Sequence, residues 1–313
     1  MDTRCIRGLD NLPDAARGCV LTVGNFDGVH LGHRRILDDA RRLADAEGAA
    51  AVAMTFDPPP DLVLRPDDQP RRITPAARKA ELLLAGGADY VVTAGTDAKL
   101  LGLSPEAFVS DVIVSRFAPR HLVEGSNFFY GQCRSGNIDT LREAGARHGF
   151  AVHVPDPVAV DLGEGPVPIS STLIRLLLLD GRVKDAARCL GRDFVLYGRV
   201  TGGQRRGRVL AYPTANIDAG GQVVPGDGIY AGRATVGGAK SAAAISVGDR
   251  PTFGPGERAV EAFLLDAEGD FYNESLALSF AERLRDQRKF ADGEALRAQI
   301  ARDVERVREI RGK

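Results

Sequence analysis

The feature that most constrains the fold is an alternation, from residue 18 to about residue 190, of short apolar runs with segments of helical periodicity. The run at residues 49–56 is apolar without polar alternation, which is typical of a strand buried on both faces of a sheet. Buried strands joined by helices form a parallel sheet with crossover helices. We therefore predict an α/β domain for the first half of the chain, with any ligand at the carboxyl ends of its strands.

Start and stop signals set the bounds of these elements. Thr74-Pro75 and Ser104-Pro105 each place a hydroxyl before a proline, which is typical of a helix N-terminus. The predicted strands are residues 19–23, 49–56, 90–93 and 121–124. The predicted helices are residues 32–47, 74–85, 104–117, 138–148, 172–179 and 183–190.

After Gly191 the pattern changes to strand-length apolar runs separated by turns that contain glycine. This pattern favours an antiparallel β-barrel, with strands at residues 194–200, 228–236, 242–247, 260–266 and 276–280. A helix predicted at residues 294–309 carries Ile300, Val304 and Val307 at helical spacing, so we expect it to pack on the barrel. The 313 residues therefore divide into two domains, 1–190 and 191–313.

Composition excludes some classes of function. The 41 Lys and Arg residues nearly balance the 42 Asp and Glu residues, so bulk charge gives no reason to expect nucleic acid or an anionic membrane as a partner. The first residues lack the apolar core of a secretory signal, and we expect a cytoplasmic protein. Cys5, Cys19, Cys133 and Cys189 lie far apart, which argues against disulfides or a zinc site and predicts small core residues.

The first chemical signal lies in residues 20–33, where a predicted strand runs through a Gly-Asn-Phe-Asp-Gly turn into a helix. Such a turn directs backbone N–H groups and the positive end of the helix at a phosphate. His30 and His33 can both reach that anion, and Gly32 leaves room for a nucleotide against the backbone. This arrangement suits attack on an α-phosphate with pyrophosphate as the leaving group. The alternative is that the two histidines only cap the helix or bind a metal.

A second signal is the stretch Pro-Ile-Ser-Ser-Thr-Leu-Ile-Arg at residues 168–175. Taken alone, its hydroxyl groups are ordinary helix N-caps. Arg175 lies one turn inside the helix, where a guanidinium together with the hydroxyl groups can hold the β- and γ-phosphates of the same nucleotide.

The third signal is a basic, glycine-rich stretch that ends in Pro-Thr-Ala-Asn, at residues 203–216. It lacks the Walker pattern G-x-x-x-x-G-K-[ST], so it is either a phosphate-binding loop of another type or a solvated basic loop. Thr214 and Asn216 share one face of an extended segment and can offer oxygen ligands to Mg²⁺.

In this order the motifs resemble those of the prokaryotic bifunctional riboflavin kinase and FAD synthetase family. The resemblance runs from about Val20 to the C-terminus and includes further motifs at residues 125–131, 225–231, 246–253, 260–264 and 283–290. It implies a Rossmann-like nucleotidyltransferase domain that joins FMN to the AMP part of ATP, forming FAD and releasing pyrophosphate. It also implies a β-barrel kinase domain that phosphorylates riboflavin with MgATP.

The resemblance also implies residue roles. In the adenylyltransferase, Asn127 would contact FMN, and His30, His33 and Arg175 would take part in the chemical step. The full set of ATP contacts would be Gly24, Phe26, His30, Gly32, His33, Ser171, Thr172 and Arg175. In the kinase, ATP would be held by Gly203, Arg206, Gly207, Thr214 and Asn216, with Thr214 and Asn216 as metal ligands and Glu261 and Arg285 against the flavin. Glu261 would accept the proton of the riboflavin 5′-hydroxyl. On the residues alone, Glu261 is equally well a strand carboxylate that faces solvent.

Three positions depart from the family pattern: Pro59 stands where the family usually has His, Tyr130 where it has Phe, and Asn137 where it has Asp. Pro59 leaves open a second interpretation, a riboflavin kinase whose adenylyltransferase module is impaired. A third interpretation is a non-catalytic flavin-nucleotide carrier. The intact kinase motifs argue against a carrier, because a binder needs no base beside the hydroxyl. The near-neutral charge and the kinase motifs exclude a tRNA ligase.

Overall fold

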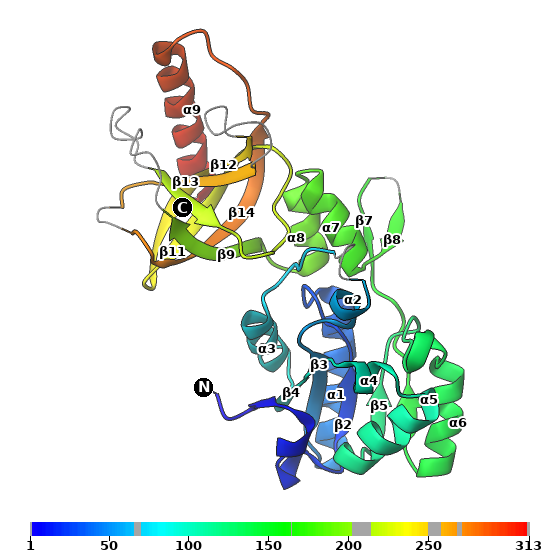
Figure 1. Cartoon of the computed structure of the whole chain (residues 1–313). Coiled ribbons are helices and arrows are strands. Elements are labelled where there is room, and N and C mark those ends of the chain that lie inside the picture. The colour runs from blue at the N-terminus through cyan, green and yellow to red at the C-terminus, as the bar shows by residue number, and fades with distance from the viewer. Residues whose placement is uncertain are drawn as a thin grey trace. The chain divides into compact units, whose positions relative to one another are not determined.

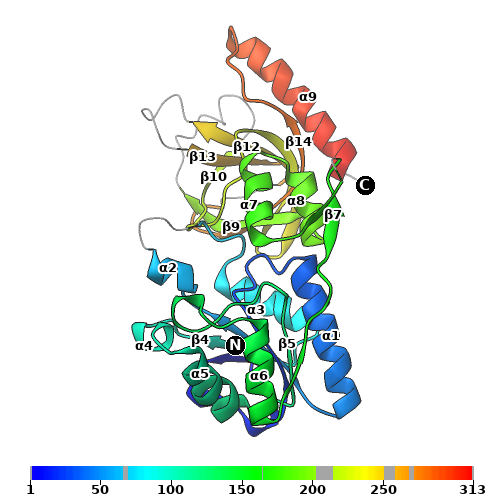
Figure 2. The same cartoon turned by 90° about the vertical axis from the view of Figure 1, so that its right-hand side faces the viewer.

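The computed structural model describes residues 2–65, 70–163, 165–201, 214–249, 258–267 and 271–311. By its internal contacts the chain forms two compact units. The first comprises Met1–Pro70 and Pro75–Ile169, and the second comprises Arg71–Thr74 and Ser170–Lys313. Figures 1 and 2 show the helices and strands of each unit.

A parallel sheet of six strands forms the centre of the first unit, with the order β1-β4-β3-β2-β5-β6. The strands are β1 (Cys5–Arg7), β2 (Val20–Val23), β3 (Ala51–Phe56), β4 (Tyr90–Ala94), β5 (His121–Val123) and β6 (Ala151–His153). The predicted parallel sheet and its four predicted strands are confirmed, with small differences at the strand ends. The two edge strands, β1 and β6, are not predicted by the apolar pattern.

Helices cover both faces of this sheet (Figure 1). On one face, α1 (Leu31–Glu47) and α3 (Ala76–Ala85) pack through buried residues such as Leu37, Ala40 and Leu83. On the other face lie the π-helix η3 (Phe108–Phe117) and α6 (Ile138–His148), with Phe108 and Leu141 in the core. The strand residues alternate between these two layers, which explains why their runs read as continuously apolar.

The remaining elements of the first unit are short. They are η1 (Leu9–Asn11), η2 (Asp14–Ala16), α2 (Pro60–Leu64), α4 (Ala98–Leu101), α5 (Pro105–Ala107), η4 (Gln132–Arg134) and the hairpin of β7 (Ala159–Asp161) and β8 (Pro166–Pro168).

The predicted helix starts hold in one of the two cases. The hydroxyl of Ser104 accepts a hydrogen bond from the Ala107 N–H at 3.1 Å, which confirms the predicted cap, although the helix continues as a π-helix after α5. Thr74 is not the N-cap of α3. That helix begins at Ala76, one residue too late for Thr74, so Pro75 occupies the N-cap position and no side chain caps it.

The second unit is a closed antiparallel barrel, as predicted. Its strand order is β10-β13-β12-β11-β14-β9, and β10 is not among the predicted strands. Its strands are β9 (Phe194–Thr201), β10 (Thr214–Asp218), β11 (Gly228–Val236), β12 (Ala239–Asp249), β13 (Arg258–Leu264) and β14 (Ser275–Arg285). The terminal helix α9 (Gly293–Arg311) packs on the barrel through Val304 and Val307, which cluster with Ala231 and Leu265. The predicted docking helix is confirmed.

Two further helices, α7 (Ser171–Leu179) and α8 (Val183–Leu190), pack on each other, and α8 contacts β9 and β14. By contacts both helices belong to the barrel unit, so the two compact units divide between Ile169 and Ser170.

The cysteines are only partly core residues. Cys19 and Cys189 are buried, but Cys5 is half-buried and Cys133 is exposed. The core prediction is wrong for Cys133, because this residue lies in the short turn η4 with a left-handed backbone, φ +54°, away from the packed layers.

Candidate active sites

The order of the parallel sheet reverses at β2. From β2 the chain passes through β3 to β4 on one side, and β5 then pairs with the other side of β2. Ligands of such sheets bind at the carboxyl ends of the strands, where the order reverses. The Gly-Asn-Phe-Asp-Gly turn follows β2 and residues 125–131 follow β5, so both motifs of this unit lie at that edge.

The turn after β2 has an unusual backbone. Phe26 and Val29 adopt positive φ angles of 47° and 39°, which non-glycine residues rarely do, and Gly28 lies between them at φ 86°. Both side chains are buried in a cluster with Leu37, and the Phe26 ring is 3% exposed. A ligand at this turn would therefore meet the backbone of Phe26 rather than its ring.

His30 and His33 are brought together at the start of α1. His30 is the N-cap, and its Nδ1 accepts a hydrogen bond from the His33 N–H at 3.3 Å. The two rings stack with centroids 3.6 Å apart and an interplanar angle of 19°. Because Nδ1 of His30 is an acceptor, the neutral ring carries its proton on Nε2. An anion that reaches Nε2 of His30 would therefore meet an N–H donor.

Gly32 lies directly against the His30 ring. A Cβ atom placed on Gly32 would lie 3.1 Å from Cε1 of His30, so the space that a side chain would take already holds the His30 ring. Gly24 is similar, because a Cβ atom there would lie 3.2 Å from the Phe26 ring. Both glycines are therefore packed closely against protein rings.

Glu124 is a residue at this edge that the motif search missed. It directly follows β5, is 2% exposed, and its Oε1 accepts a hydrogen bond from the Val23 N–H at 2.6 Å. Burial raises the pKa of this carboxyl well above its usual range, because desolvation disfavours the charged form. An acidic residue at the end of the apolar run 121–123 is the signal that could have found it.

Lys79 on α3 is the second residue that the motif search missed. Its side chain is 4% exposed, and its Nζ donates to the backbone carbonyls of Asn25 at 3.0 Å and Phe56 at 3.1 Å. Lys79 lies four residues before the buried Leu83, on the same face of the helix. This spacing is the sequence signal for a lysine that points into the domain.

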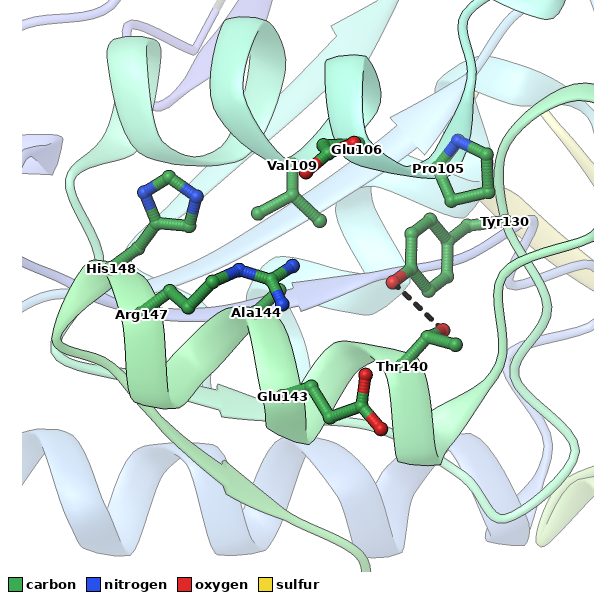
Figure 3. A pocket seen from close by; sticks show the side chains of 9 residues that line it. All are labelled: Pro105, Glu106, Val109, Tyr130, Thr140, Glu143, Ala144, Arg147 and His148. Carbon is green, nitrogen blue, oxygen red and sulfur yellow. Dashed lines mark hydrogen bonds between the residues drawn. The ribbon is translucent and has the colours of Figure 1, made fainter.

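The segment after β5 combines exposed and packed residues. Asn127, the predicted FMN contact, is exposed. The Tyr130 ring is buried against Phe108 and Phe128, and its hydroxyl lies 3.2 Å from Oγ1 of Thr140. This pair lines a cavity of about 170 Å³. Figure 3 shows its lining side chains, which are Pro105, Glu106, Val109, Tyr130, Thr140, Glu143, Ala144, Arg147 and His148.

Two of the three departures from the family pattern have structural explanations. The Tyr130 hydroxyl gains Thr140 as a partner. Asn137 caps α6, because its Oδ1 accepts from the N–H groups of Asp139 and Thr140, and Oγ1 of Thr140 accepts from the Asn137 N–H in return. Such a reciprocal capping box is served by Asn as well as by Asp. The third departure, Pro59, is the N-cap of α2 and follows β3 at the same edge as the turn after β2.

The predicted phosphate contacts of residues 171–175 lie on α7. Ser170 is the N-cap, with its hydroxyl accepting from the Leu173 N–H at 3.1 Å, so Ser171 and Thr172 occupy the first turn. Nε of Arg175 donates to the backbone carbonyl of Arg71 at 2.9 Å.

The barrel brings two predicted kinase residues together. Asn216 of β10 lies directly opposite Glu261 of β13, which in turn lies opposite Ser246 of β12. Residues opposite one another across strands project on the same face, so these three form a polar row. Asn216 is 5% exposed, and the amide of Gln287 donates to the Ser246 hydroxyl at 3.1 Å. Glu261 is half-buried rather than a fully solvent-facing carboxylate.

Other predicted kinase residues are only partly described. Thr214 is the first residue of β10, two residues before Asn216 and therefore on the same face of the strand. Only the backbone of Thr214 is described. Gly203, Arg206 and Gly207 lie outside the described residues. The Arg285 guanidinium forms a bidentate ion pair with Asp303 of α9, in which Nη2 donates to Oδ2 at 2.6 Å and Nε donates to Oδ1 at 3.1 Å. This pair holds Arg285 against the terminal helix.

The described residues contain neither a metal-binding cluster nor a membrane-spanning helix. No group of three or more His, Cys, Asp or Glu residues among them is arranged to hold a metal ion. Within the same part of the chain, no helix has the length and apolar character that crossing a membrane requires.

A parallel-sheet domain with a His-x-Gly-His turn at its switch strand, joined to a barrel with a polar strand row, defines a two-domain ATP-dependent transferase. Family models match both parts of the chain. Residues 12–173 match the FAD synthetase model, and residues 190–311 match the riboflavin kinase model.

Full-length relatives agree with this division. The chain is 35% identical to the bifunctional riboflavin kinase/FMN adenylyltransferase of Escherichia coli K12, covering 99% of this chain and 98% of the relative. It is 36% identical to the enzyme of the same name from Pseudomonas fluorescens, with 97% of each chain covered. A crystal structure from Streptococcus pneumoniae, described as a macrolide-efflux protein, has a TM-score of 0.86 and 27% identity, covering 97% of this chain and 99% of that one.

The chain belongs to the bifunctional riboflavin kinase/FMN adenylyltransferase family. It is an enzyme that phosphorylates riboflavin to FMN and adenylylates FMN to FAD, with ATP as the donor in both reactions. Such kinases and adenylyltransferases generally use ATP with a divalent metal ion.

Proposed function

We propose that the two reactions take place in separate domains, FMN adenylylation in residues 1–190 and riboflavin phosphorylation in residues 191–313. The ranges matched by the two family models support this division, with residues 174–189 between them. A cytoplasmic location is part of the proposal, because both reactions consume ATP.

In the adenylyl transfer, a phosphate oxygen of FMN attacks the α-phosphorus of ATP, and the bond from that phosphorus to the bridging oxygen of pyrophosphate breaks. The FMN phosphate is already ionised, so no general base is required. The task of the protein is to align the two reactants and to stabilise negative charge. The observation that carries this assignment is the stacked His30–His33 pair at the N-terminus of α1.

The remaining contacts of this reaction follow the family motif. We assign Gly24, Phe26 and Gly32 to the ATP turn through their backbones, and Ser171, Thr172 and Arg175 to the triphosphate. Asn127 is assigned to FMN, which its exposure after β5 supports.

In the phosphoryl transfer, the 5′-hydroxyl oxygen of riboflavin attacks the γ-phosphorus of ATP, the bond to the ADP oxygen breaks, and the hydroxyl proton moves to the Glu261 carboxylate. A neutral hydroxyl attacks better when an acceptor lies within hydrogen-bond reach of its proton. The position of Glu261 beside Asn216 in the polar row supports this role. Arg285 is assigned to the flavin side by the family motif.

We propose Mg²⁺ as the metal of the kinase. Asn216 and Thr214 supply neutral oxygen donors, which fit a hard cation that is bound largely through the phosphates of ATP. When bound, Mg²⁺ would neutralise charge on those phosphates. Gly203, Arg206 and Gly207 are assigned to the ATP loop.

Incubation of the enzyme with riboflavin and MgATP, followed by chromatographic separation of the flavins, tests the whole assignment. We expect FMN at early times and FAD later. FMN alone would favour a kinase with an impaired adenylyltransferase module, and unchanged riboflavin would contradict both activities. Replacing Mg²⁺ by a chelator should stop FMN formation.

A further inference from the structure

Lys79 joins two turns at the edge where we place adenylyl transfer. Its Nζ donates one hydrogen bond to the carbonyl of Asn25, which lies in the turn that leads to His30. The other goes to the carbonyl of Phe56, the last residue of β3, just before the turn that contains Pro59. A single buried ammonium group therefore holds the ends of two neighbouring strands together.

The turn held by Lys79 needs external support. Phe26, Gly28 and Val29 all have positive φ angles, and non-glycine residues in that region persist only where the surroundings impose the conformation. The Asn25 carbonyl accepts two bonds from buried donors, from Nζ of Lys79 at 3.0 Å and from the hydroxyl of Thr55 at 3.3 Å. These bonds fix the carbonyl on the protein side of the turn.

The shape of this turn determines where the first N–H groups of α1 and the two imidazole rings point. His30 lies two residues after the turn and is the N-cap of α1. If the Asn25 carbonyl rotates, the backbone that positions the His30 ring rotates with it.

We propose that Lys79 is a positioning residue for adenylyl transfer, which ties the turn at Asn25 to the turn at Phe56 so that His30 and His33 meet the phosphates of ATP in the reactive geometry. This inference rests on the proposed assignment of the reaction to that turn. It predicts an effect on kcat rather than on ATP binding, because the rest of the nucleotide contacts remain.

The test is FAD formation from FMN and ATP by Lys79→Met, which keeps the length of the side chain and removes both the donor and the charge. We expect kcat to fall about 10²-fold, the scale of a small misplacement of reacting groups, with a much smaller change in KM for ATP. The matched control is Arg78→Met, the neighbouring residue on α3, whose half-exposed side chain pairs with Glu81. This control should leave both activities unchanged.

In the same samples, the rate of riboflavin phosphorylation and the thermal unfolding temperature show whether each variant is folded. Lys79→Arg, which keeps a cation with N–H donors, should recover part of the lost kcat. If Lys79→Met does not fold, Lys79→Gln replaces it, because the amide keeps one donor; a lowered kcat with Gln supports the proposal. Turnover of the folded Met or Gln variant within about twofold of the unmodified enzyme would overturn it.

His33→Ala in the same assay tests separately whether adenylyl transfer takes place at this turn, on which the role of Lys79 depends. If FAD formation survives His33→Ala, the reaction does not take place at this turn and the proposed function fails. If His33→Ala is inactive and folded Lys79→Met is fully active, only the role of Lys79 is wrong.

Discussion

Nδ1 of His30 accepts the backbone N–H of His33 at 3.3 Å, and the two rings stack at 3.6 Å. This relationship divides two roles between the two nitrogens of one ring. Nδ1 stabilises the start of α1 as an N-cap, and Nε2 carries the proton that can be donated to a phosphate. His33 uses only its backbone N–H in the cap, so its side chain can be removed without loss of the cap.

His33→Ala should therefore lower FAD formation without unfolding the domain. Loss of one donor to a charged transition state typically reduces the rate by about 10²-fold or more. Riboflavin phosphorylation by the same sample should be unchanged, which provides the control. The measurement is the initial rate of FAD formation from FMN beside the rate of FMN formation from riboflavin. A parallel fall of both rates in a folded variant would contradict the assignment of the reactions to separate domains.

Replacing His30 should reveal both of its roles. His30→Ala removes the cap and the donor, so we expect a loss of about 0.5–2 kcal/mol in stability together with a loss of FAD formation. His30→Asn restores a good N-cap acceptor but has no imidazole donor. Thermal unfolding should therefore recover with Asn while FAD formation stays low. Recovery of FAD formation with Asn would show that His30 acts only as a cap.

Glu261→Gln should remove the proton acceptor while leaving the strand that carries it intact. The change keeps the size of the side chain, so flavin binding should be retained while riboflavin phosphorylation falls by roughly 10²- to 10⁴-fold. Adenylylation of added FMN should continue. Glu282→Gln is a suitable control, because Glu282 lies on β14 of the same barrel and pairs with Lys184. Kinase turnover near that of the control would show that Glu261 is only a strand residue.

The sequence predicts the elements whose signals are local. Strand β3 is a continuous apolar run, Ser104 stands directly before the proline of α5, and His30 finds its capping partner within three residues. Strands β1, β6, β7 and β8 were missed because none of them has more than one buried residue, whereas the equally short β5, which was predicted, has two.

The buried charged residues were missed for a different reason. Lys79 bonds to Asn25, 54 residues away, and Glu124 bonds to Val23, 101 residues away. Such partners exist only after the sheet has formed, so no local pattern encodes them.

Pro59 gives a quantitative prediction for the adenylyltransferase. Proline has neither a ring donor nor a backbone N–H, and it holds the N-cap position of α2 with φ −58°. Because His30, His33, Ser171 and Arg175 remain, we expect the absent histidine to cost about tenfold in rate, or ~1.4 kcal/mol. The unmodified enzyme should form FAD slowly, and Pro59→His should raise the rate by that factor without changing FMN formation. No FAD from the unmodified enzyme would contradict this, and a hundredfold gain would make the histidine a transition-state donor.

The pKa of Glu124 predicts how the stability of the enzyme depends on pH. Burial raises this pKa well above its usual value of 4.5, so above that pH the unfolded chain releases a proton that the folded chain keeps. The folded state then binds more protons than the unfolded state, and stability falls as pH rises from 4.5 toward the folded pKa.

Glu124→Gln removes this dependence, because the amide cannot ionise while its oxygen can still accept from the Val23 N–H. We expect the variant to unfold at a higher temperature than the unmodified enzyme at about pH 8, with the difference shrinking toward about pH 5. Comparing the two proteins at each pH cancels the titration of all other groups. Thermal unfolding across this range is the measurement. A difference that does not vary with pH would mean that the carboxyl is ionised in the folded enzyme, with Val23 N–H bonded to a carboxylate instead of an acid.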